Sequence, residues 1–408
     1  MSRTRPINCI IPPYILEKLM ENGDGEVRQA ALDTLLTTAR LRGERSVRRG
    51  LTGLAASPGN SRRTVFDCEH SEDLSDAVMA RSEDGPESSD EAVNRAFDAL
   101  GLTRDFYKEV YQRNSIDDHG MRLNGFVHYG VRINNAFWDG GEMLFGDGDG
   151  VEFSNLTGSL DVVGHELAHG VTEHTSNFEY HNQSGALNES VSDVFGSLVK
   201  QWSMKQTVEE ADWLIGADVW TPGIAGDALR SMKAPGTAYD NPLVGKDPQP
   251  DRMSRFVHLP DTPRGDNGAV HYNSGIPNKA FYATAMGIGG FGWERCGMLW
   301  YEALRASRPR DKFQDFADMT FQQAGRLFGT GSPEQAAVVA GWHEVEVQIT
   351  GVPPGLAQPR SFAVNGNGHG GAGREADLAA LTRQIATLGD KVTGLAKEVA
   401  TLKVKGSR

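Results

Sequence analysis

The chain has 408 residues, 39% of them hydrophobic, with a formal net charge of −13. Residues 1–63 carry a net +5 and residues 351–408 a net +4, so residues 64–350 carry −22. This length suffices for two or three domains, the acidic middle disfavours a nucleic-acid partner, and the lack of any run of 18 apolar residues disfavours a membrane span.

The N-terminal sequence and the cysteines indicate in which compartment the chain is expected. The opening MSRTRPINCIIPPYILEKLM interrupts a short apolar run with Pro12-Pro13 and has no recognisable secretory core or cleavage site. Cys9, Cys68 and Cys296 are scattered and odd in number, which favours small buried residues in a reducing compartment over a disulfide framework. We therefore expect the chain to be cytoplasmic at synthesis, with secretion by a non-classical route as the alternative.

Residues 1–63 form a small appendage in the sequence pattern. Apolar residues at helical spacing predict one helix from about residue 14 to Gly23 and a second over about 26–41. Two short amphipathic helices cannot bury both of their apolar faces alone, so we expect them to dock on a larger body. The basic and then Gly/Ser/Pro-rich stretch over 43–63 predicts a linker that proteases can cut.

The middle of the chain predicts a mixed domain. After the acidic loop SEDGPESSD, a helix is expected near 89–113, followed by short alternating runs typical of strands. From about 158 to 350 the pattern is mainly helical. These patterns predict an α+β protein. The Asp-rich GDGDG at 146–150 predicts a plain turn, with a cation site as the alternative.

The C-terminal tail divides into two parts. Residues 351–374 are rich in Pro, Gly and Asn and predict a flexible linker. Residues 375–404 hold four heptads with β-branched residues at most a positions and leucine at d, which favours a parallel two-stranded coiled coil and hence a homo-oligomer. A single helix folding back on the body is the alternative. The heptad residues are Leu378, Leu381, Ile385, Leu388, Val392, Leu395, Val399 and Leu402.

The segment DVVGHELAHGVTEH, residues 161–174, carries the strongest chemical signal. His165 and His169 are four residues apart, so on a helix they project from one face at a spacing that suits one Zn²⁺. Glu166 lies beside the first histidine and can act as a general base without binding the metal. A surface helix with two incidental histidines is the alternative.

A third ligand is expected downstream, in GALNESVSDVFGSLV, residues 185–199. Glu189 and Asp193 are four residues apart on one helical face. One interpretation is that they belong to an ordinary acidic face of a helix. If instead they lie beside His165 and His169, Glu189 is the third metal ligand and Asp193 accepts a hydrogen bond from the N–H of a ligating imidazole.

Taken together, HELAH and NESVSD resemble the thermolysin-like neutral metalloproteases (gluzincins), and four further segments match in order. These are NNAFWDGGEM, MLFGDGDG, TPGIAGDALRSM and DNGAVHYNSGIPNKAFY, so that the resemblance spans about 64–350. The opening CIIPPYILEKL resembles the short propeptide of the protealysin-like subgroup. The resemblance implies a fold of two lobes, a β-rich lobe with the zinc helix over 64–185 and a helical lobe over 186–350, together with one catalytic zinc. It also implies an N-terminal segment (1–63 with its activation linker) that inhibits the enzyme and is removed near 50–63.

The resemblance also implies roles for individual residues. His165, His169 and Glu189 match the zinc ligands and Glu166 the base. His271 matches the second catalytic histidine, oriented by Asp266. The remaining matches are Tyr180 as a further oxyanion donor, Arg230 as the residue that binds a substrate carbonyl, Asn135 and Ala136 as the edge that binds the substrate backbone, and Phe153, Leu156, Val162, Ile215 and Leu229 as the apolar pocket on the leaving-group side.

One departure concerns calcium. Asp161 and Asp212 match two ligands of the family's double calcium site, but Lys200, Leu214 and Ala217 stand where the others belong. An ammonium among the remaining carboxylates makes a poor calcium site. We therefore expect Lys200 to pair with Asp161 and Asp212 in place of the double calcium.

These features favour a zinc endopeptidase precursor that cuts proteins or peptides before large hydrophobic residues and is held latent by its own N-terminal helices. Two alternatives remain. One is a catalytically silent zinc protein that serves as an oligomeric scaffold, which the tail favours and Glu166, His271 and Asp266 disfavour. The other is a narrow-specificity processing protease with the same mechanism.

Overall fold

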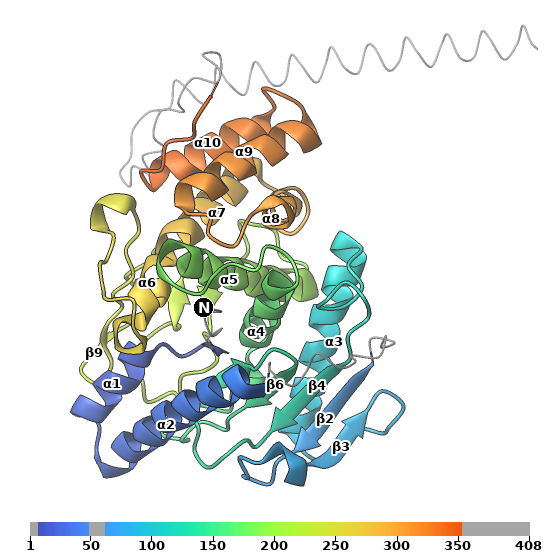
Figure 1. Cartoon of the computed structure of the whole chain (residues 1–408), viewed down its shortest axis with the longest axis vertical. Coiled ribbons are helices and arrows are strands. Elements are labelled where there is room, and N and C mark those ends of the chain that lie inside the picture. Colours follow the sequence, from blue (N-terminus) through green and yellow to red (C-terminus); the bar gives the residue numbers. More distant parts are fainter. Residues whose placement is uncertain (1–6, 49–61, 353–408) are drawn as a thin grey trace, which may run out of the picture. The chain divides into compact units, whose positions relative to one another are not determined.

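A computed structural model describes residues 7–48 and 62–352 (Figure 1). Its β-rich lobe is built on one six-stranded sheet in the order β1-β5-β6-β4-β2-β3. Two parallel pairings, β2–β4 and β4–β6, form its centre, and antiparallel pairings lie on both sides. The strands are β1 (Asn8–Cys9), β2 (Arg63–Asp67), β3 (Val78–Ser82), β4 (Leu123–Val127), β5 (Ala136–Trp138) and β6 (Glu142–Phe145).

Two long helices cover the sheet. Helix α3 (Glu91–Tyr111) begins at Asp90, whose side chain accepts hydrogen bonds from the N–H groups of Ala92 and Val93, and it packs on β2 and β4. Helix α4 (Leu160–Glu173) packs on β5 and on α3. The segment HELAH is therefore buried between the sheet and the second lobe.

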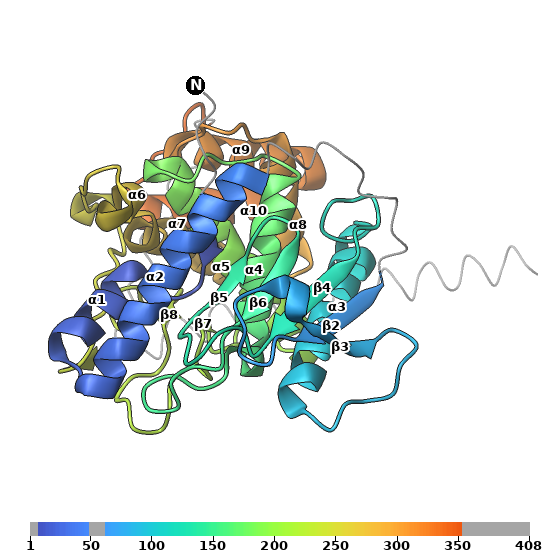
Figure 2. The same cartoon turned by 60° about the horizontal axis from the view of Figure 1, so that its bottom comes forward.

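The second lobe is helical. Helix α5 packs along α4, and the other helices follow it away from the sheet (Figures 1 and 2). Its helices are α5 (Asn182–Met204), α6 (Asp266–Asn273), α7 (Gly275–Ile288), α8 (Arg295–Ala306), α9 (Phe313–Phe328) and α10 (Pro333–Glu344), and its short strand pairs are β7 (Leu214–Ile215) with β8 (Arg230–Ser231) and β9 (Asp240–Asn241) with β10 (Gly245–Lys246).

The N-terminal segment lies against the body, as its amphipathic pattern predicted. Helix α1 (Pro13–Asn22) has a proline at its first position and is followed by Gly23, and α2 (Gly25–Arg48) runs seven residues beyond its predicted end. The side chains of Ile15, Leu16 and Leu19 are almost fully buried in the main core. Residues 8–9 were not predicted as a strand, yet they form β1 at the edge of the sheet.

The α+β fold with a β-rich and a helical lobe is confirmed. The predicted division after residue 185 falls inside α5, so a division within 174–181, between α4 and α5, leaves both helices whole. Most of the 43–63 linker, the 351–374 linker and the heptad tail lie outside the described residues. In the part of the chain that the structure describes, no helix is both long enough and apolar enough to span a bilayer.

Candidate active site

Two glycines let α4 and α5 cross at close range. A Cβ on Gly164 would lie 3.0 Å from the Cα of Gly196, and a Cβ on Gly196 would lie only 2.4 Å from the carbonyl oxygen of Asp161. Because a Cβ at Gly196 has no room and one at Gly164 would be tight, the two glycines let the inner faces of the helices come together. His165 and His169 on α4 thus face Glu189 and its neighbours on α5.

Three side chains converge at this crossing. The Nε2 atoms of His165 and His169 are 3.0 Å apart, and each lies 3.5 Å from a carboxylate oxygen of Glu189. All three residues are at most 1% exposed, and Glu189 Oε2 has no hydrogen-bond partner. Two imidazoles and a carboxylate that aim their free atoms at one point form a donor set that fits Zn²⁺.

The far sides of both imidazoles are held by α5. His165 Nδ1 lies 2.8 Å from Asp193 Oδ1, and His169 Nδ1 lies 2.8 Å from Asn188 Oδ1. A hydrogen bond at Nδ1 leaves Nε2 unprotonated and pointing inward, as a metal ligand requires. Although burial opposes the effect, Arg230 and His165 hold the pKa of Asp193 below its usual range.

Glu166 lies next to these residues but points to the sheet. Its Oε2 accepts a hydrogen bond from the backbone N–H of Trp138 on β5 at 3.1 Å, while Oε1 is buried without a partner. Burial, reinforced by the charge of Glu189, raises the pKa of Glu166 well above its usual value. A carboxylate with a raised pKa and one free oxygen is suited to accept and return a proton.

A left-handed turn holds His271 on the opposite side. Residues Asp266, Asn267, Gly268 and Ala269 all have φ between +50° and +85°, a conformation that L-residues rarely adopt consecutively. The turn lets the Asp266 carboxylate bond both the backbone N–H of His271, at 2.8 Å, and its ring Nδ1, at 2.6 Å. Burial lowers the pKa of His271, but Asp266 and Glu189 outweigh it and raise the value to about 9.

Tyr180 completes this side of the site. Its hydroxyl donates to Glu189 Oε1 and lies 3.3 Å from His271 Nε2. His271 Nε2 in turn lies 3.4 Å from Glu189 Oε2. The structure therefore brings together every residue for which the sequence predicted a catalytic or metal-binding role.

The residues with predicted substrate contacts meet the N-terminal segment of this chain. Asn135 accepts a hydrogen bond from the N–H of Ile11 at 3.0 Å and donates one to its carbonyl oxygen at 3.2 Å. Arg230 donates to the Ile10 carbonyl oxygen at 3.0 Å and also bonds both oxygens of Asp193. Ala136 begins β5, the strand that pairs with β1. The predicted pocket residues are at most 1% exposed and belong to one hydrophobic cluster with Ile10; they are Phe153, Leu156, Val162, Ile215 and Leu229.

The predicted calcium-site remnant forms an ion-pair network. Lys200 Nζ lies 3.2 Å from Asp161 Oδ2 and 2.9 Å from Asp212 Oδ2. Burial lowers the pKa of Lys200, but Asp161 and Asp212 outweigh it and raise the value above normal. The ammonium is therefore held in its charged form between the two carboxylates.

Several contributing residues were missed from the sequence. Gly164 and Gly196 lie inside the two motifs, one residue before His165 and seven after Glu189, so their proximity to the ligands was the available signal. Asn188 directly precedes Glu189. Asn278, which donates to Asp193 Oδ2 at 2.8 Å, lies 85 residues after Asp193, inside the matched segment DNGAVHYNSGIPNKAFY, so its place in that motif was the available signal.

Comparisons with known proteins agree with this geometry. Residues 59–173 match a family model described as the thermolysin metallopeptidase catalytic domain, and 176–347 match its alpha-helical domain. An "Extracellular metalloprotease" of Pectobacterium carotovorum is 45% identical over 349 residues, which cover 85% of this chain and 98% of that protein. An "Extracellular minor metalloprotease" of Serratia marcescens is 40% identical over 353 residues, covering 82% and 94%.

A solved structure is also similar. The precursor of protealysin, a metalloproteinase from Serratia proteamaculans, matches with a TM-score of 0.75 and 45% identity, and the match covers 83% of this chain and 99% of that one. The cytoplasmic location expected from the sequence is contradicted, because two similar proteins are named as extracellular. A reducing compartment inferred from scattered cysteines was therefore a poor guide to location.

Proposed function

This chain belongs to the thermolysin family of zinc metallopeptidases, and on that premise we propose that it is an extracellular endopeptidase made as a precursor that its own N-terminal segment keeps inactive. Members of the family are metalloendopeptidases that act on proteins. The finer features that we propose are the roles of individual residues, cleavage before large hydrophobic residues, and autoinhibition. Contact of residues 9–11 with His271, Arg230 and Asn135 is the observation that carries the proposal.

We assign His165, His169 and Glu189 as the zinc ligands. When bound, zinc supplies a Lewis acid that polarises the scissile carbonyl group and lowers the pKa of a water molecule. Glu166 accepts a proton from the attacking water through its free Oε1 and donates it to the leaving amine. Trp138 N–H holds the other carboxylate oxygen and so fixes the direction of this transfer.

His271 and Tyr180 stabilise negative charge on the substrate carbonyl oxygen. The raised pKa of His271 keeps its ring in the imidazolium form, in which Nδ1–H donates to Asp266 and Nε2–H is the donor toward the cleft. Hydrogen-bond donors arranged before the reaction stabilise charge that develops in the transition state. Arg230 binds the first carbonyl group after the scissile bond. Asn135 binds the backbone of the residue that follows.

Burial by the N-terminal segment accounts for latency. His165, Glu166 and His169 are 0% exposed and His271 is 2% exposed, so substrate cannot reach them in the intact chain. The backbone around Cys9 fills the space in front of His271. Cleavage within 43–63 and release of the segment should therefore expose the catalytic groups, together with the apolar pocket that selects large hydrophobic side chains.

Activity and zinc content should be measured on the full chain before and after limited proteolysis. We expect about one equivalent of zinc in both forms, and activity on casein or a fluorogenic peptide only after cleavage. A zinc chelator should abolish this activity, and added zinc should restore it. Full activity of the intact chain would refute autoinhibition, and a cleaved, zinc-loaded chain without activity would favour the silent scaffold.

We also propose that Lys200 replaces the family's double calcium site. The support is electrostatic: its ammonium already neutralises Asp161 and Asp212, the carboxylates that a calcium ion would need. Self-association through residues 375–404 stays a prediction, since these residues lie outside the described part of the chain. The mass of the particle in solution, with and without 375–408, tests it.

A further inference from the structure

A second group of side chains with metal-binding atoms lies at the carboxyl ends of two neighbouring strands. Asp67 ends β2, and His128 directly follows β4, which pairs with β2 in parallel. Asp90, which caps the first turn of α3, reaches the same place from the helix that packs on these strands. One oxygen or nitrogen atom from each of the three residues lies within 4.8 Å of the other two. The tertiary structure thus brings together donors from three separate elements.

The imidazole of His128 is oriented in the way that a metal-binding histidine is. Its Nδ1 lies 2.8 Å from Asp147 Oδ1, and its Nε2 lies 2.8 Å from Asp90 Oδ2. Asn155 donates a hydrogen bond to Asp147 Oδ1 at 2.7 Å and so holds this carboxylate in place. Histidines that bind metals commonly donate their other N–H to a carboxylate, which fixes the ring. With Nδ1–H donated to Asp147, a metal ion can replace the proton at Nε2.

Negative charge prevails around His128. The carboxylates of Asp67, Asp90 and Asp147 lie near it, and within the described part of the chain no lysine or arginine forms an ion pair with any of them. The imidazole of His70 is also close, with Nδ1 3.5 Å from Asp147 Oδ2. Three carboxylates beside two imidazoles leave a negative charge that a divalent cation can neutralise.

The turn GDGDG (146–150) contributes to this arrangement through its first aspartate. Asp149 accepts hydrogen bonds from the N–H groups of residues 151–153, so it stabilises the turn itself. Asp147 instead bonds His128. The cation site that the sequence left as an alternative for this segment is therefore expected beside the turn, at His128, and not within it.

We propose that Asp67, Asp90 and His128 form a second metal site, separate from the catalytic centre, that binds a divalent transition-metal ion such as Zn²⁺. One imidazole nitrogen and two carboxylate oxygens supply three corners of the tetrahedron that Zn²⁺ prefers, and 19% exposure of His128 and 37% of Asp90 leave the last corner to water. Calcium fits poorly because it takes about six to eight oxygen ligands. The bound ion links the ends of β2 and β4 to the start of α3.

Zinc binding by the full chain tests this proposal. Because the site is partly exposed, we expect it to fill only when micromolar free zinc is added, beyond the single equivalent expected in the protein as purified. After equilibrium dialysis and elemental analysis, the wild type should hold one equivalent more than Asp67→Asn or His128→Gln. This difference does not depend on whether the catalytic centre is filled or on the proposed peptidase function.

Matched variants separate metal binding from folding. Asp67→Asn keeps the size of the side chain and an oxygen that can accept the N–H of Glu69, so the fold should be retained while the ion binds at least about tenfold more weakly. Asp147→Asn leaves the three ligands in place but removes the charge that holds His128 Nδ1, and should weaken zinc binding about 10–100-fold. His119→Gln, at an exposed histidine in the acidic stretch IDDHG, is the control and should change neither value.

Thermal unfolding gives a second measurement. An ion that binds only the folded chain raises the melting temperature, and zinc at about 100 times its Kd should raise that of the wild type by about 2 °C or more. Asp67→Asn should lack this rise, and millimolar Ca²⁺ should not reproduce it in the wild type. Equal zinc content in the wild type, Asp67→Asn and His128→Gln would overturn the proposal and leave the proton as the cation held by these aspartates. An equal zinc-induced rise in the wild type and Asp67→Asn would overturn it as well.

Discussion

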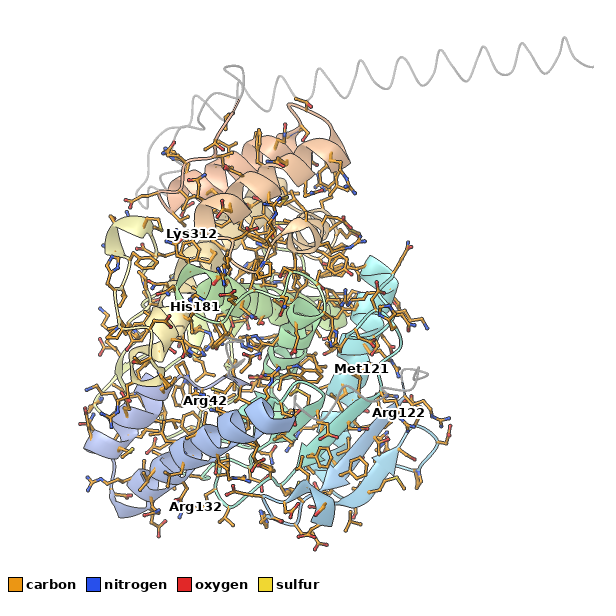
Figure 3. The ribbon with its side chains drawn as sticks, in the orientation of Figure 1. Arg42, Met121, Arg122, Arg132, His181 and Lys312 are labelled. Atoms are coloured by element: carbon orange, nitrogen blue, oxygen red, sulfur yellow. The ribbon has the colours of Figure 1, made fainter. Side chains whose placement is uncertain are left out.

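Arg45, near the end of α2, forms an ion pair with Glu173, the last residue of α4, at 2.6 Å with only 6% and 13% of the two side chains exposed. The N-terminal segment is thus tied to the same helix that carries His165 and His169. Arg132 and Glu26 form a second link at 3.3 Å, near the other end of α2, with 36% and 76% of the two side chains exposed. Figure 3 labels Arg132. Because the Arg45–Glu173 pair is the more buried of the two, we expect it to contribute more to holding the N-terminal segment on the body.

Replacing Arg45 by Ala should speed activation. Loss of a mostly buried ion pair typically costs about 1–3 kcal/mol, so the segment should open more often and the intact chain should show roughly tenfold more activity before cleavage. Lys18→Ala removes an exposed pair with Glu21 inside α1 and is the matched control. Equal latency of the two variants would show that this ion pair does not hold the segment.

Glu166→Gln should separate metal binding from turnover. The amide keeps the shape of the side chain and does not alter the three proposed ligands, so zinc content by elemental analysis should stay near one equivalent. Loss of the base should lower kcat by about 10²–10⁴-fold in the cleaved enzyme. Wild-type turnover by a zinc-loaded variant would exclude Glu166 as the base.

Gly196→Ala should damage both stability and the metal site. The new methyl group would meet the Asp161 carbonyl oxygen at 2.4 Å and His165 N at 3.0 Å, so α4 and α5 must separate. Overpacking of this kind costs about 1–3 kcal/mol, visible as a lower melting temperature and weaker zinc retention. Gly158→Ala, where nothing lies within 4 Å of the added carbon, is the control and should leave both unchanged.

Calcium should have little effect on stability. Lys200 already bridges Asp161, which is 1% exposed, and Asp212, so millimolar Ca²⁺ should leave the melting temperature of the wild type unchanged. Lys200→Met removes the charge but keeps the stem, and should cost about 3 kcal/mol because Asp161 remains buried. Lys200→Arg retains the charge and should be milder. A large Ca²⁺-induced rise in the wild type would contradict the proposed replacement.

Stability should fall at alkaline pH through His128. Its ring nitrogens lie 2.8 Å from Asp147 and 2.8 Å from Asp90, with His70 beside them. Hydrogen bonding to Asp147, against partial burial, raises the pKa of His128 from 6.5 to about 9. Because the folded-state pKa is the higher one, the stabilisation is complete below about pH 6.5 and is lost as the pH rises through 9.

The corresponding measurement is urea unfolding between pH 6 and 10. Allowing for solvent screening, His128 should account for about 1–2 kcal/mol of the loss. His128→Gln should flatten this part of the profile, whereas His119→Gln, at an exposed position, should not. An unchanged slope in His128→Gln would show that another group causes the alkaline loss.

Much of the catalytic centre was accessible from the sequence because its information is local. His165, Glu166 and His169 lie within five residues, and helical periodicity alone brings the two histidines to one face. Local spacing within two further motifs likewise singled out Glu189 with Asp193, and Asp266 with His271. The family resemblance then predicted that the three motifs contribute to one site. Local spacing also predicted the helices of the N-terminal segment, although α2 extends further because its C-terminal part packs against the body and pairs with Glu173.

What the tertiary structure alone decided is which distant segments meet. The pairing of Cys9 with Phe137, the contact of the Cys9 carbonyl with His271 and the approach of Gly164 to Gly196 join residues that no local pattern relates. The first two use backbone N–H and C=O groups, which nearly every residue carries, so side-chain identities do not specify the partner. The sequence by itself determined the family and the helices of the N-terminal segment; long-range backbone pairing decided that residues 8–11 lie on β5 beside His271, Arg230 and Asn135.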